Sequence, residues 1–343
     1  MSQRTQKPLL RAHQLGFSYK EKSRSRQRRG ASHPAVSDVS FEINAGEIFG
    51  IAGESGSGKS TLTRLLARLL NPTHGHIEWQ GKDYRSLRGA DDMQARRRIQ
   101  LVFQDSGTAL SPRRTIEHTL TEPLDHFRIG RKNERRDRCL QALHAVGLDA
   151  SAMAAWPHQL STGQQQRICI ARAVLADPDL IIADEAVSAL DVSVQAQVME
   201  LIRSLRAEKG IAFLLVSHDL AVIRQLADRV GVMLSGRLVE QATAERLFHQ
   251  AAHPYTRSLL AAVSEPDPEA SNRLDPVTPW QLLRASRGCA FSRHCPEALA
   301  LCHDMAPKLT LLHELPLHGV ECHARMQSLQ HGHKETRPSD ESE

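Results

Sequence analysis

The chain has 343 residues, of which 41% are hydrophobic and 24% are charged, and its formal net charge is +5. These values are ordinary for a globular protein large enough to bury a sizeable core, so they exclude fibrous and wholly disordered classes. Aromatic residues make up only 4% of the chain. That low content, with the small net charge, argues against a nucleic-acid partner whose bases stack on aromatic rings.

No apolar run is long enough to span a bilayer, and the polar N-terminus lacks the apolar stretch of a secretory signal. We therefore expect a cytoplasmic protein whose six cysteines are reduced thiols or metal ligands rather than disulfides. Basic residues gather in a polar insertion at residues 20–34 and at Arg96-Arg97-Arg98. We interpret both as solvated surface, with contact to anionic lipid or an acidic partner as the alternative.

Apolar patterns in the first part of the chain predict two outer strands, a buried strand and a helix. Residues 8–19 form a short β segment, and residues 35–52 alternate before becoming the apolar run of a buried parallel strand. A helix begins at Ser60 and is ended by Asn71-Pro72. Its apolar face repeats at helical spacing through Leu62, Leu65, Leu66, Leu69 and Leu70.

The rest of the chain predicts helices that alternate with buried strands. Residues 105–178 are mostly helical, and amphipathic segments run over 135–146 and 164–176. Three buried strands follow, which indicates a parallel α/β sheet; they are 180–183, 212–216 and 229–233. A linker is predicted at residue 264, and the polar tail after residue 328 is expected to be disordered.

A phosphate-binding motif lies between the first buried strand and the first helix. Residues 53–60 match G-x-x-x-x-G-K-[ST] in the strand–helix context that this motif requires. The glycines let several backbone N–H groups face one phosphate chain, and the helix N-terminus adds positive partial charge. Lys59 would reach the β and γ phosphates, and Ser60 would bind Mg²⁺. The expected ATP-binding residues are Gly53, Glu54, Ser55, Gly56, Ser57, Gly58, Lys59, Ser60 and Thr61.

An acidic pair, Asp184-Glu185, follows the next buried strand. The carboxyl ends of parallel strands face the ligand, so Asp184 is placed to hold Mg²⁺ and Glu185 to polarise an attacking water. Acidic residues that stabilise a helix N-terminus are the alternative, but the upstream phosphate loop favours the catalytic interpretation.

With these motifs, residues 8–263 resemble an ATP-binding cassette (ABC) transporter ATPase. The further motifs occur in the expected order and are Gln104 in Val-Phe-Gln-Asp, the signature-like segment Leu160 to Arg167, Ser188-Ala189-Leu190-Asp191, and Ser217-His218-Asp219. Two departures stand out. Thr162 replaces the usual signature glycine, where a Cβ restricts the backbone, and Ala186-Val187 replaces the usual Pro-Thr. These two departures leave open whether the ATP site completed by this signature is less active than usual.

The resemblance implies a role for each matching residue. Tyr19 would stack on adenine, Gln104 would touch Mg²⁺ or water, and His218 would contact the γ-phosphate. Catalysis would rest on Glu185, His218 and Lys59, mostly through positioning and charge stabilisation of the transferred phosphoryl group. The signature would contact the γ-phosphate bound by a second subunit, so ATP is held between two ATPase domains; its contacting residues are Ser161, Gly163 and Gln164.

The C-terminal third resembles ATPases of oligopeptide, dipeptide and nickel importers, on residues 253–260 and 288–296. By itself, the segment 255–263 predicts a short amphipathic helix packed on the core. Four cysteines in this region are spaced x5, x6 and x19, which is not a zinc-ribbon pattern; they are Cys289, Cys295, Cys302 and Cys322.

Some importer ATPases of this type carry a [4Fe–4S] cluster, so the resemblance implies one on these four thiolates. Zinc and unoccupied thiols are the alternatives. Nearby histidines are alternative zinc ligands or simply surface residues: His294, His303, His318 and His323. Cys139 and Cys169 lie in helical segments and are expected to be small core residues.

The expected fold is an α/β P-loop NTPase. A RecA-like parallel sheet core would carry an N-terminal antiparallel β subdomain, a helical subdomain at about 105–178 and a small Cys-containing extension. The expected boundaries are 1–263 for the ATPase domain, 264–328 for the extension and 329–343 for the tail.

The resemblance implies an ATP-hydrolysing subunit that energises an importer of peptides or related small solutes. Its implied partners are a second ABC ATPase subunit, two membrane-spanning permeases and an extracytoplasmic solute-binding protein, with the chain at the cytoplasmic face of a bacterial inner membrane. One alternative is a soluble ABC ATPase acting on ribosomes or DNA, although one cassette and 107 residues from Gly53 to Ser161 disfavour it. Another is a non-hydrolysing regulatory subunit, which Glu185 and His218 argue against.

Overall fold

The computed structural model describes residues 7–19, 34–187, 190–262, 288–312 and 317–326. The basic insertion except Pro34, Ser188-Ala189, the linker at residue 264 and the C-terminal tail lie outside the described residues. None of the described helices combines the length and the apolar character needed to cross a bilayer.

A central sheet of eight strands forms the core, in the order β11-β12-β10-β9-β3-β8-β7-β6. Its middle strands pair in parallel, as the alternation of strands and helices predicts. β3, β7 and β8 are buried at every residue, which explains their continuous apolar sequences. The strands are β3 (Ile48–Ala52), β6 (Ile99–Val102), β7 (Leu180–Asp184), β8 (Ala212–Val216), β9 (Arg229–Leu234), β10 (Arg237–Thr243), β11 (Thr310–Leu311) and β12 (Gly319–Val320).

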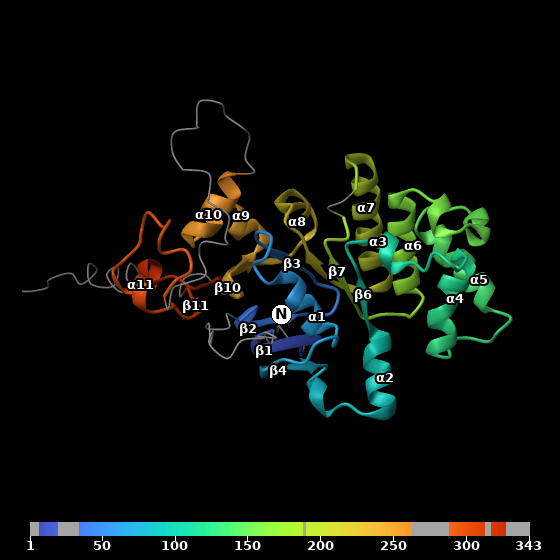
Figure 1. Ribbon diagram of the computed structural model, residues 1–343, viewed down its shortest axis with the longest axis horizontal. Helices are drawn as coiled ribbons and strands as arrows, with labels where there is room; N and C mark the ends of the chain where they lie inside the picture. The colour runs from blue at the N-terminus through green and yellow to red at the C-terminus, as the bar shows by residue number, and fades with distance from the viewer. Residues whose placement is uncertain (1–6, 20–33, 188–189, 263–287, 313–316, 327–343) are drawn as a thin grey trace, which may run out of the picture.

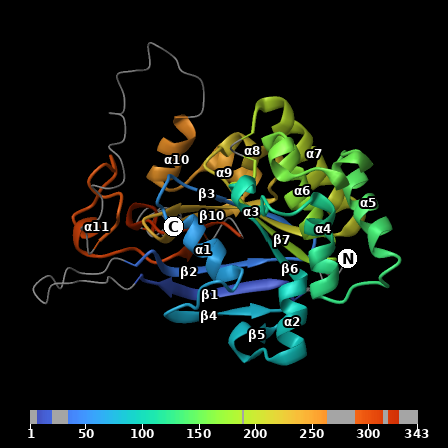
Figure 2. The same ribbon diagram turned by 45° about the vertical axis from the view of Figure 1, so that its right-hand side comes forward.

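A second, antiparallel sheet has the order β2-β1-β4-β5 and lies beneath the central sheet in Figure 2. Leucines of α1 pack in one apolar cluster with residues of both sheets, so this helix is buried between them. The strands are β1 (Leu10–Phe17), β2 (Val36–Ile43), β4 (His74–Trp79) and β5 (Lys82–Asp83), and α1 is Lys59–Leu66.

The predicted end of the first helix is wrong. α1 stops at Leu66, and Arg68 adopts a positive φ of 61° that turns the chain away from the helix axis. Arg68 then pairs with Asp92 and lies over the Tyr84 ring. As a result Leu69 is 54% exposed instead of continuing the buried face.

Helices form a group at one end of the molecule, and α11 and β11 lie at the opposite end (Figure 1). The helical group contains Cys139 and Cys169, both buried in its apolar cluster as predicted. Its helices are α3 (Ser106–Ala109), α4 (Ile116–His126), α5 (Arg135–Ala145) and α6 (Thr162–Val174). The remaining helices are α2 (Gly89–Arg98), α7 (Val192–Lys209), α8 (Leu220–Leu226), α9 (Ala244–Gln250), α10 (Pro254–Ala261) and α11 (Leu301–Asp304).

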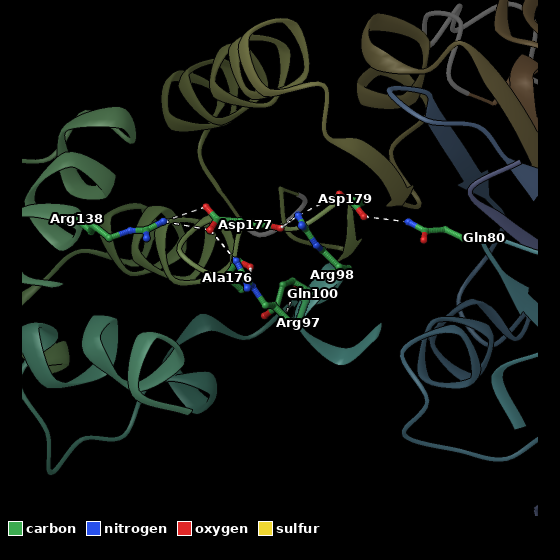
Figure 3. Close-up of polar contacts among 8 residues, drawn as sticks. All are labelled: Gln80, Arg97, Arg98, Gln100, Arg138, Ala176, Asp177 and Asp179. Carbon is green, nitrogen blue, oxygen red and sulfur yellow. Dashed lines mark hydrogen bonds and ion pairs between the residues drawn. The ribbon is translucent and has the colours of Figure 1, made fainter. Parts of the chain in front are cut away.

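The sequence analysis interpreted the arginine cluster as solvated surface. In the structure, Arg97 and Arg98 instead belong to an ionic network that joins three parts of the fold. Asp177 accepts hydrogen bonds from Arg97 of α2 at 2.9 Å and from Arg138 of α5 at 3.1 Å. Asp179 accepts from Arg98 at 3.3 Å and from Gln80, beyond β4, at 3.2 Å. Figure 3 shows the network crossing from the helical group to the antiparallel sheet.

Asp177→Asn should loosen the link between the helical group and the core. The carboxylate and its arginines are 30–42% exposed, so we expect a loss of only about 1 kcal/mol of unfolding free energy, smaller at high salt. Urea unfolding at two salt concentrations measures it, with Glu208→Gln as an exposed control. A loss that does not change with salt would contradict an ionic origin.

Candidate active site

The phosphate loop connects β3 to α1 through two glycines in backbone conformations that side chains disfavour. Gly53 has φ +148° and Gly58 has φ +106°. A Cβ on Gly53 would lie 2.4 Å from the Met233 carbonyl oxygen, and one on Gly58 would lie 2.3 Å from that of Ala35. Only glycine therefore allows the loop to curl at these points, as the motif requires.

Lys59 lies across this loop with its side chain 4% exposed. Its Nζ donates to the carbonyl oxygens of Gly53 at 2.7 Å and Glu54 at 2.9 Å and lies 4.0 Å from Glu185 Oε1. Burial lowers the pKa of this ammonium, while the charges of Glu185, Asp184 and Glu54 raise it. A buried cation held over the loop's backbone is suited to receive a phosphate.

Asp184 ends β7 and faces the start of α1. Its carboxylate accepts hydrogen bonds from Thr63 Oγ1 at 3.0 Å and Ser60 Oγ at 3.5 Å, and burial raises its pKa. Within the described residues, no cationic side chain forms an ion pair with it. A buried carboxylate with hydroxyl partners and no direct counter-ion fits a divalent cation, which prefers oxygen ligands.

Glu185 joins two predicted site residues that are far apart in sequence. Its Oε2 accepts a hydrogen bond from Gln104 Nε2 at 2.8 Å and lies 3.4 Å from His218 Nδ1. The residue itself has φ +51°, and its backbone N–H donates to the Val216 carbonyl at 2.8 Å. Strained backbone that neighbouring strands hold in place is typical of active sites.

Tyr19 lies beside the phosphate loop despite the insertion that follows it. Its hydroxyl is 3.2 Å from Thr61 Oγ1, and its ring packs edge-on against Phe17. With 48% of the residue exposed, the ring offers an aromatic surface next to the loop. This position is compatible with the predicted stacking on adenine.

The signature-like segment begins α6, within the helical group and away from α1 (Figure 1). Ser161 caps the helix: its hydroxyl accepts the Gln164 N–H at 3.3 Å, and the Gln164 side chain accepts the Ser161 N–H at 2.9 Å. A Cβ on Gly163 would lie 2.4 Å from Val194 Cγ1. The chain therefore separates its own signature from its own phosphate loop.

The two departures from the family pattern are accommodated by ordinary packing. Thr162 is the first residue of α6 and is not among the residues with positive φ, so its Cβ meets no backbone strain. Ala186 and Val187 are 5% and 4% exposed and belong to the core cluster around the helical group.

Two residues near the loop were missed by sequence reasoning. Thr63 lies one helical turn after Ser60, so its contact with Asp184 follows from helical periodicity. The hydroxyl of Tyr255 accepts the Glu54 N–H at 3.3 Å from α10, 201 residues away. No local pattern marks that second contact.

The four C-terminal cysteines gather in one region. Cys289 N–H donates to the Cys302 carbonyl at 2.8 Å, and burial raises the pKa of Cys289 to about 11. The charges of Cys295, Cys302 and Cys322 raise this pKa further, and Cys289 and Cys295 pack against the same apolar cluster. Among the described residues, however, no three of them bring their Sγ atoms within 4.8 Å of one another.

The separation of these Sγ atoms does not fit a preformed zinc site. Zinc–sulfur bonds of about 2.3 Å in a tetrahedron would hold the sulfurs roughly 3.8 Å apart.

The glycine-constrained loop, the buried lysine and the acidic pair define a P-loop ATPase of the ATP-binding cassette class. Residues 36–188 match the ABC transporter family, and residues 239–302 match the oligopeptide/dipeptide transporter C-terminal region. A putative peptide import ATP-binding protein of Brucella ovis is 43% identical over 313 residues, which are 89% of this chain and 95% of the relative.

The oligopeptide transport ATP-binding protein AppF of Bacillus subtilis is 40% identical over 87% of this chain and 91% of its own length. Among solved structures, the ATP-binding cassette MJ0796, a dimer in a post-hydrolysis state with ADP and Pi, gives a TM-score of 0.61 at 30% identity. The matched region covers 68% of this chain and 98% of the MJ0796 cassette. The chain belongs to the ABC transporter family, as the motifs predicted, and it is an ATP-binding, ATP-hydrolysing member.

Asp184→Asn should stabilise the nucleotide-free protein. Because burial raises the folded pKa above the ordinary value, the ionised carboxylate lowers stability; this penalty is absent below the ordinary pKa and complete above the folded pKa. We expect the melting temperature of the variant to exceed that of wild type by about 1–3 °C at pH 7, and the gain to vanish in acid.

The variant should also lose the stabilisation that MgATP gives to wild type. Thermal unfolding without MgATP measures the gain in melting temperature, and thermal unfolding with MgATP measures this loss. Asp191→Asn is the matched control, because hydrogen bonds from Val194 and Ser193 lower the pKa of Asp191 and its neutralisation should give no gain. A nucleotide-free variant less stable than wild type at pH 7 would contradict the interpretation of Asp184.

Proposed function

We propose that this chain is the ATP-hydrolysing subunit of an importer for peptides or related small solutes. The observation that carries the proposal is the contact set of Glu185. In one chain it joins Gln104, His218 and the loop lysine, whereas the signature that would complete the site lies in the separate helical group. A catalytic half-site of this kind needs a second cassette.

Each residue of the half-site has a proposed role in phosphoryl transfer. Lys59 and the loop N–H groups bind the β and γ phosphates and stabilise the charge of the transition state. Glu185 accepts the proton of the attacking water, and Gln104 and His218 hold its carboxylate in position. Tyr19 supports the adenine ring.

Mg²⁺ would be held by Ser60, Asp184 and Gln104. When bound, it would neutralise charge on the phosphate oxygens. Gln104 reaches Glu185 in this structure, so it would have to turn from that carboxylate to bind the ion.

The second half of each site comes from a partner cassette. Ser161, Gly163 and Gln164 present the capped N-terminus of α6, whose partial positive charge suits a γ-phosphate. Two chains, or this chain and a related subunit, would close on ATP and separate after hydrolysis. A dimer of the related cassette MJ0796 has been solved with ADP and Pi, which supports this arrangement.

Peptide import is supported by the relatives. The proteins of Brucella ovis and Bacillus subtilis are named for peptide import and oligopeptide transport, and the match at residues 239–302 is to the C-terminal region of such transporters. We propose two membrane-spanning permeases and an extracytoplasmic solute-binding protein as partners, and a peripheral place at the cytoplasmic face of the inner membrane. These relatives give no support to the ribosome- or DNA-associated alternative.

Glu185→Gln tests the function. In the complex with its permeases, the variant should bind ATP normally but lose hydrolysis and uptake by about 10²-fold or more, because the amide cannot accept the water's proton. Phosphate release and solute uptake in reconstituted vesicles are the measurements, with Glu208→Gln as an exposed control. A Glu185→Gln variant that hydrolyses ATP and drives uptake at wild-type rates would refute the assignment.

We propose further that the four C-terminal cysteines hold a [4Fe–4S] cluster. Their clustering and their spacing, wider than zinc requires, support it. The matched region ends at Cys302, so three of the four lie within it.

The chain purified without oxygen should show a broad absorbance near about 400 nm and about four irons per chain. Cys289→Ser should lose the band, whereas Cys139→Ser, at a buried core cysteine, should keep it. Stoichiometric zinc without this band would overturn the cluster.

A further inference from the structure

A buried tyrosine of the C-terminal region reaches the phosphate loop. Tyr255 is 2% exposed, and its hydroxyl oxygen accepts the N–H of Glu54 at 3.3 Å. Glu54 directly follows Gly53, and the carbonyl oxygens of these two residues hold Lys59 Nζ. The tyrosine therefore fixes the segment of the loop that positions the catalytic ammonium.

Buried polar contacts hold Tyr255 itself in place. His253, 1% exposed, caps α10 by accepting the Tyr255 N–H on Nδ1 at 3.0 Å; burial lowers its pKa to about 4, so this nitrogen stays free to accept. The carboxylate of Glu240, on β10, accepts the backbone N–H of His253 at 3.0 Å and lies 2.7 Å from His318 Nε2. The tyrosine is thus anchored both to the core sheet and to the C-terminal residues.

A phenylalanine joins this tyrosine to the cysteine region. Phe291 is 2% exposed and lies between Cys289 and Cys295 in sequence. Its ring packs edge-on against Tyr255 at 5.6 Å and tilted against His253 at 6.2 Å, measured between ring centroids. Cys289 and Cys295 pack against the same apolar cluster as Phe291 and Tyr255, so continuous packing leads from these two cysteines to the Glu54 N–H.

We propose that Tyr255 is a positioning residue of the ATP site and couples it to the cysteine region. The hydroxyl holds the loop so that Lys59 is ready for phosphate, and the ring transmits changes between Phe291 and the loop. Because coupling between two sites is reciprocal, ATP binding must also alter the region around Phe291. This proposal rests on the ATP site alone and is independent of the transported solute and of what the cysteines bind.

Tyr255→Phe tests the hydroxyl while keeping the ring. We expect the Kd for MgATP to rise about 3- to 10-fold, as loss of one buried hydrogen bond implies, and kcat at saturating ATP to fall by no more than the same factor, because Lys59 is less well positioned while Glu185 keeps its contacts. Tyr84→Phe is the matched control, since Tyr84 is equally buried but packs against Arg68 rather than the loop.

Amide hydrogen exchange of residues 288–302 tests the coupling, because ATP would not change these exchange rates if Tyr255 had only a structural role. ATP should slow exchange there in wild type and in Tyr84→Phe, and should have no effect in Tyr255→Phe. Wild-type ATP affinity in Tyr255→Phe, or the same loss in Tyr84→Phe, would overturn the positioning role. An ATP effect on exchange that survives in Tyr255→Phe would overturn the coupling.

A different observation supports a second inference, on the antiparallel sheet. His13 of β1 pairs with His76 of β4, and their rings stack at 4.6 Å between centroids. Glu78 lies two residues further along β4 on the same face, with its Oε1 at 3.5 Å from His76 Nε2 and 3.8 Å from His13 Nε2. The side chains are 29–44% exposed, so solutes can reach all three.

These separations are longer than direct hydrogen bonds and close to those between the ligand atoms of a metal site, and all three ligand atoms lie within 4.8 Å of one another. Metal–ligand bonds of about 2.0–2.2 Å in a tetrahedron place ligand atoms roughly 3.3–3.6 Å apart. Arg11, which faces Glu78 across the sheet, instead bonds Glu42 at 3.1 Å. Within the part of the chain that the structure describes, the Glu78 carboxylate therefore makes its ion-pair contacts with the imidazoles of His13 and His76.

The backbone on both strands is specialised next to this cluster. Gln14 has φ +45° beside a break in the β1–β4 register, and Gly75 has φ +74° where a Cβ would lie 2.3 Å from the carbonyl oxygens of His13 and Gln14. Irregularities of this kind re-aim neighbouring side chains. The geometry points to a site for a divalent transition-metal ion, best matched by Zn²⁺ with water as its fourth ligand.

Zinc binding to the full chain tests this site. Equilibrium dialysis against Zn²⁺ should show one zinc per chain that is lost in His76→Ala and retained in His74→Ala, an exposed neighbour on β4 outside the cluster. X-ray absorption of that zinc should show nitrogen and oxygen ligands at about 2.0–2.1 Å rather than sulfur at about 2.3 Å. Unchanged zinc content in His76→Ala, or sulfur ligands alone, would overturn the inference.

Discussion

The buried ammonium of Lys59 is the interaction on which the rest of the site depends. Its position is set by two carbonyl oxygens of a loop that only glycines can form, and its charge is opposed by burial and supported by three carboxylates. Placing a cation in such surroundings costs free energy that a bound polyphosphate offsets. The site is therefore prepared for a bound phosphate at the expense of stability, as the raised pKa of Asp184 also indicates.

Much of the fold follows from sequence because its buried strands have an unambiguous pattern. β3, β7 and β8 are covered on both faces and are apolar throughout, so they and the motifs at their ends could be predicted. β6, by contrast, is only four residues long and partly exposed, and it follows directly on three arginines. Nothing in so short a segment separates it from the end of the helix before it.

Contacts made by single residues across long sequence distances were the part that sequence could not supply. The end of α1 depends on Arg68, which finds partners in Asp92 and Tyr84, and the arginine cluster depends on aspartates about 80 residues away. The contact of Tyr255 with Glu54 is of the same kind. Motifs predicted which residues would bear the chemistry, whereas the contacts that hold those residues in place came only from the three-dimensional packing.

The ionic network of Figure 3 gains meaning from its place on β7. Asp177 and Asp179 precede this five-residue strand, and Glu185 follows it. The helical group is thus tied, through Arg138 and Asp177, to one end of a strand whose other end carries the proposed catalytic carboxylate of Glu185. A rotation of the helical group would therefore disturb these arginine–aspartate contacts first, and the five-residue strand would carry the displacement toward Glu185.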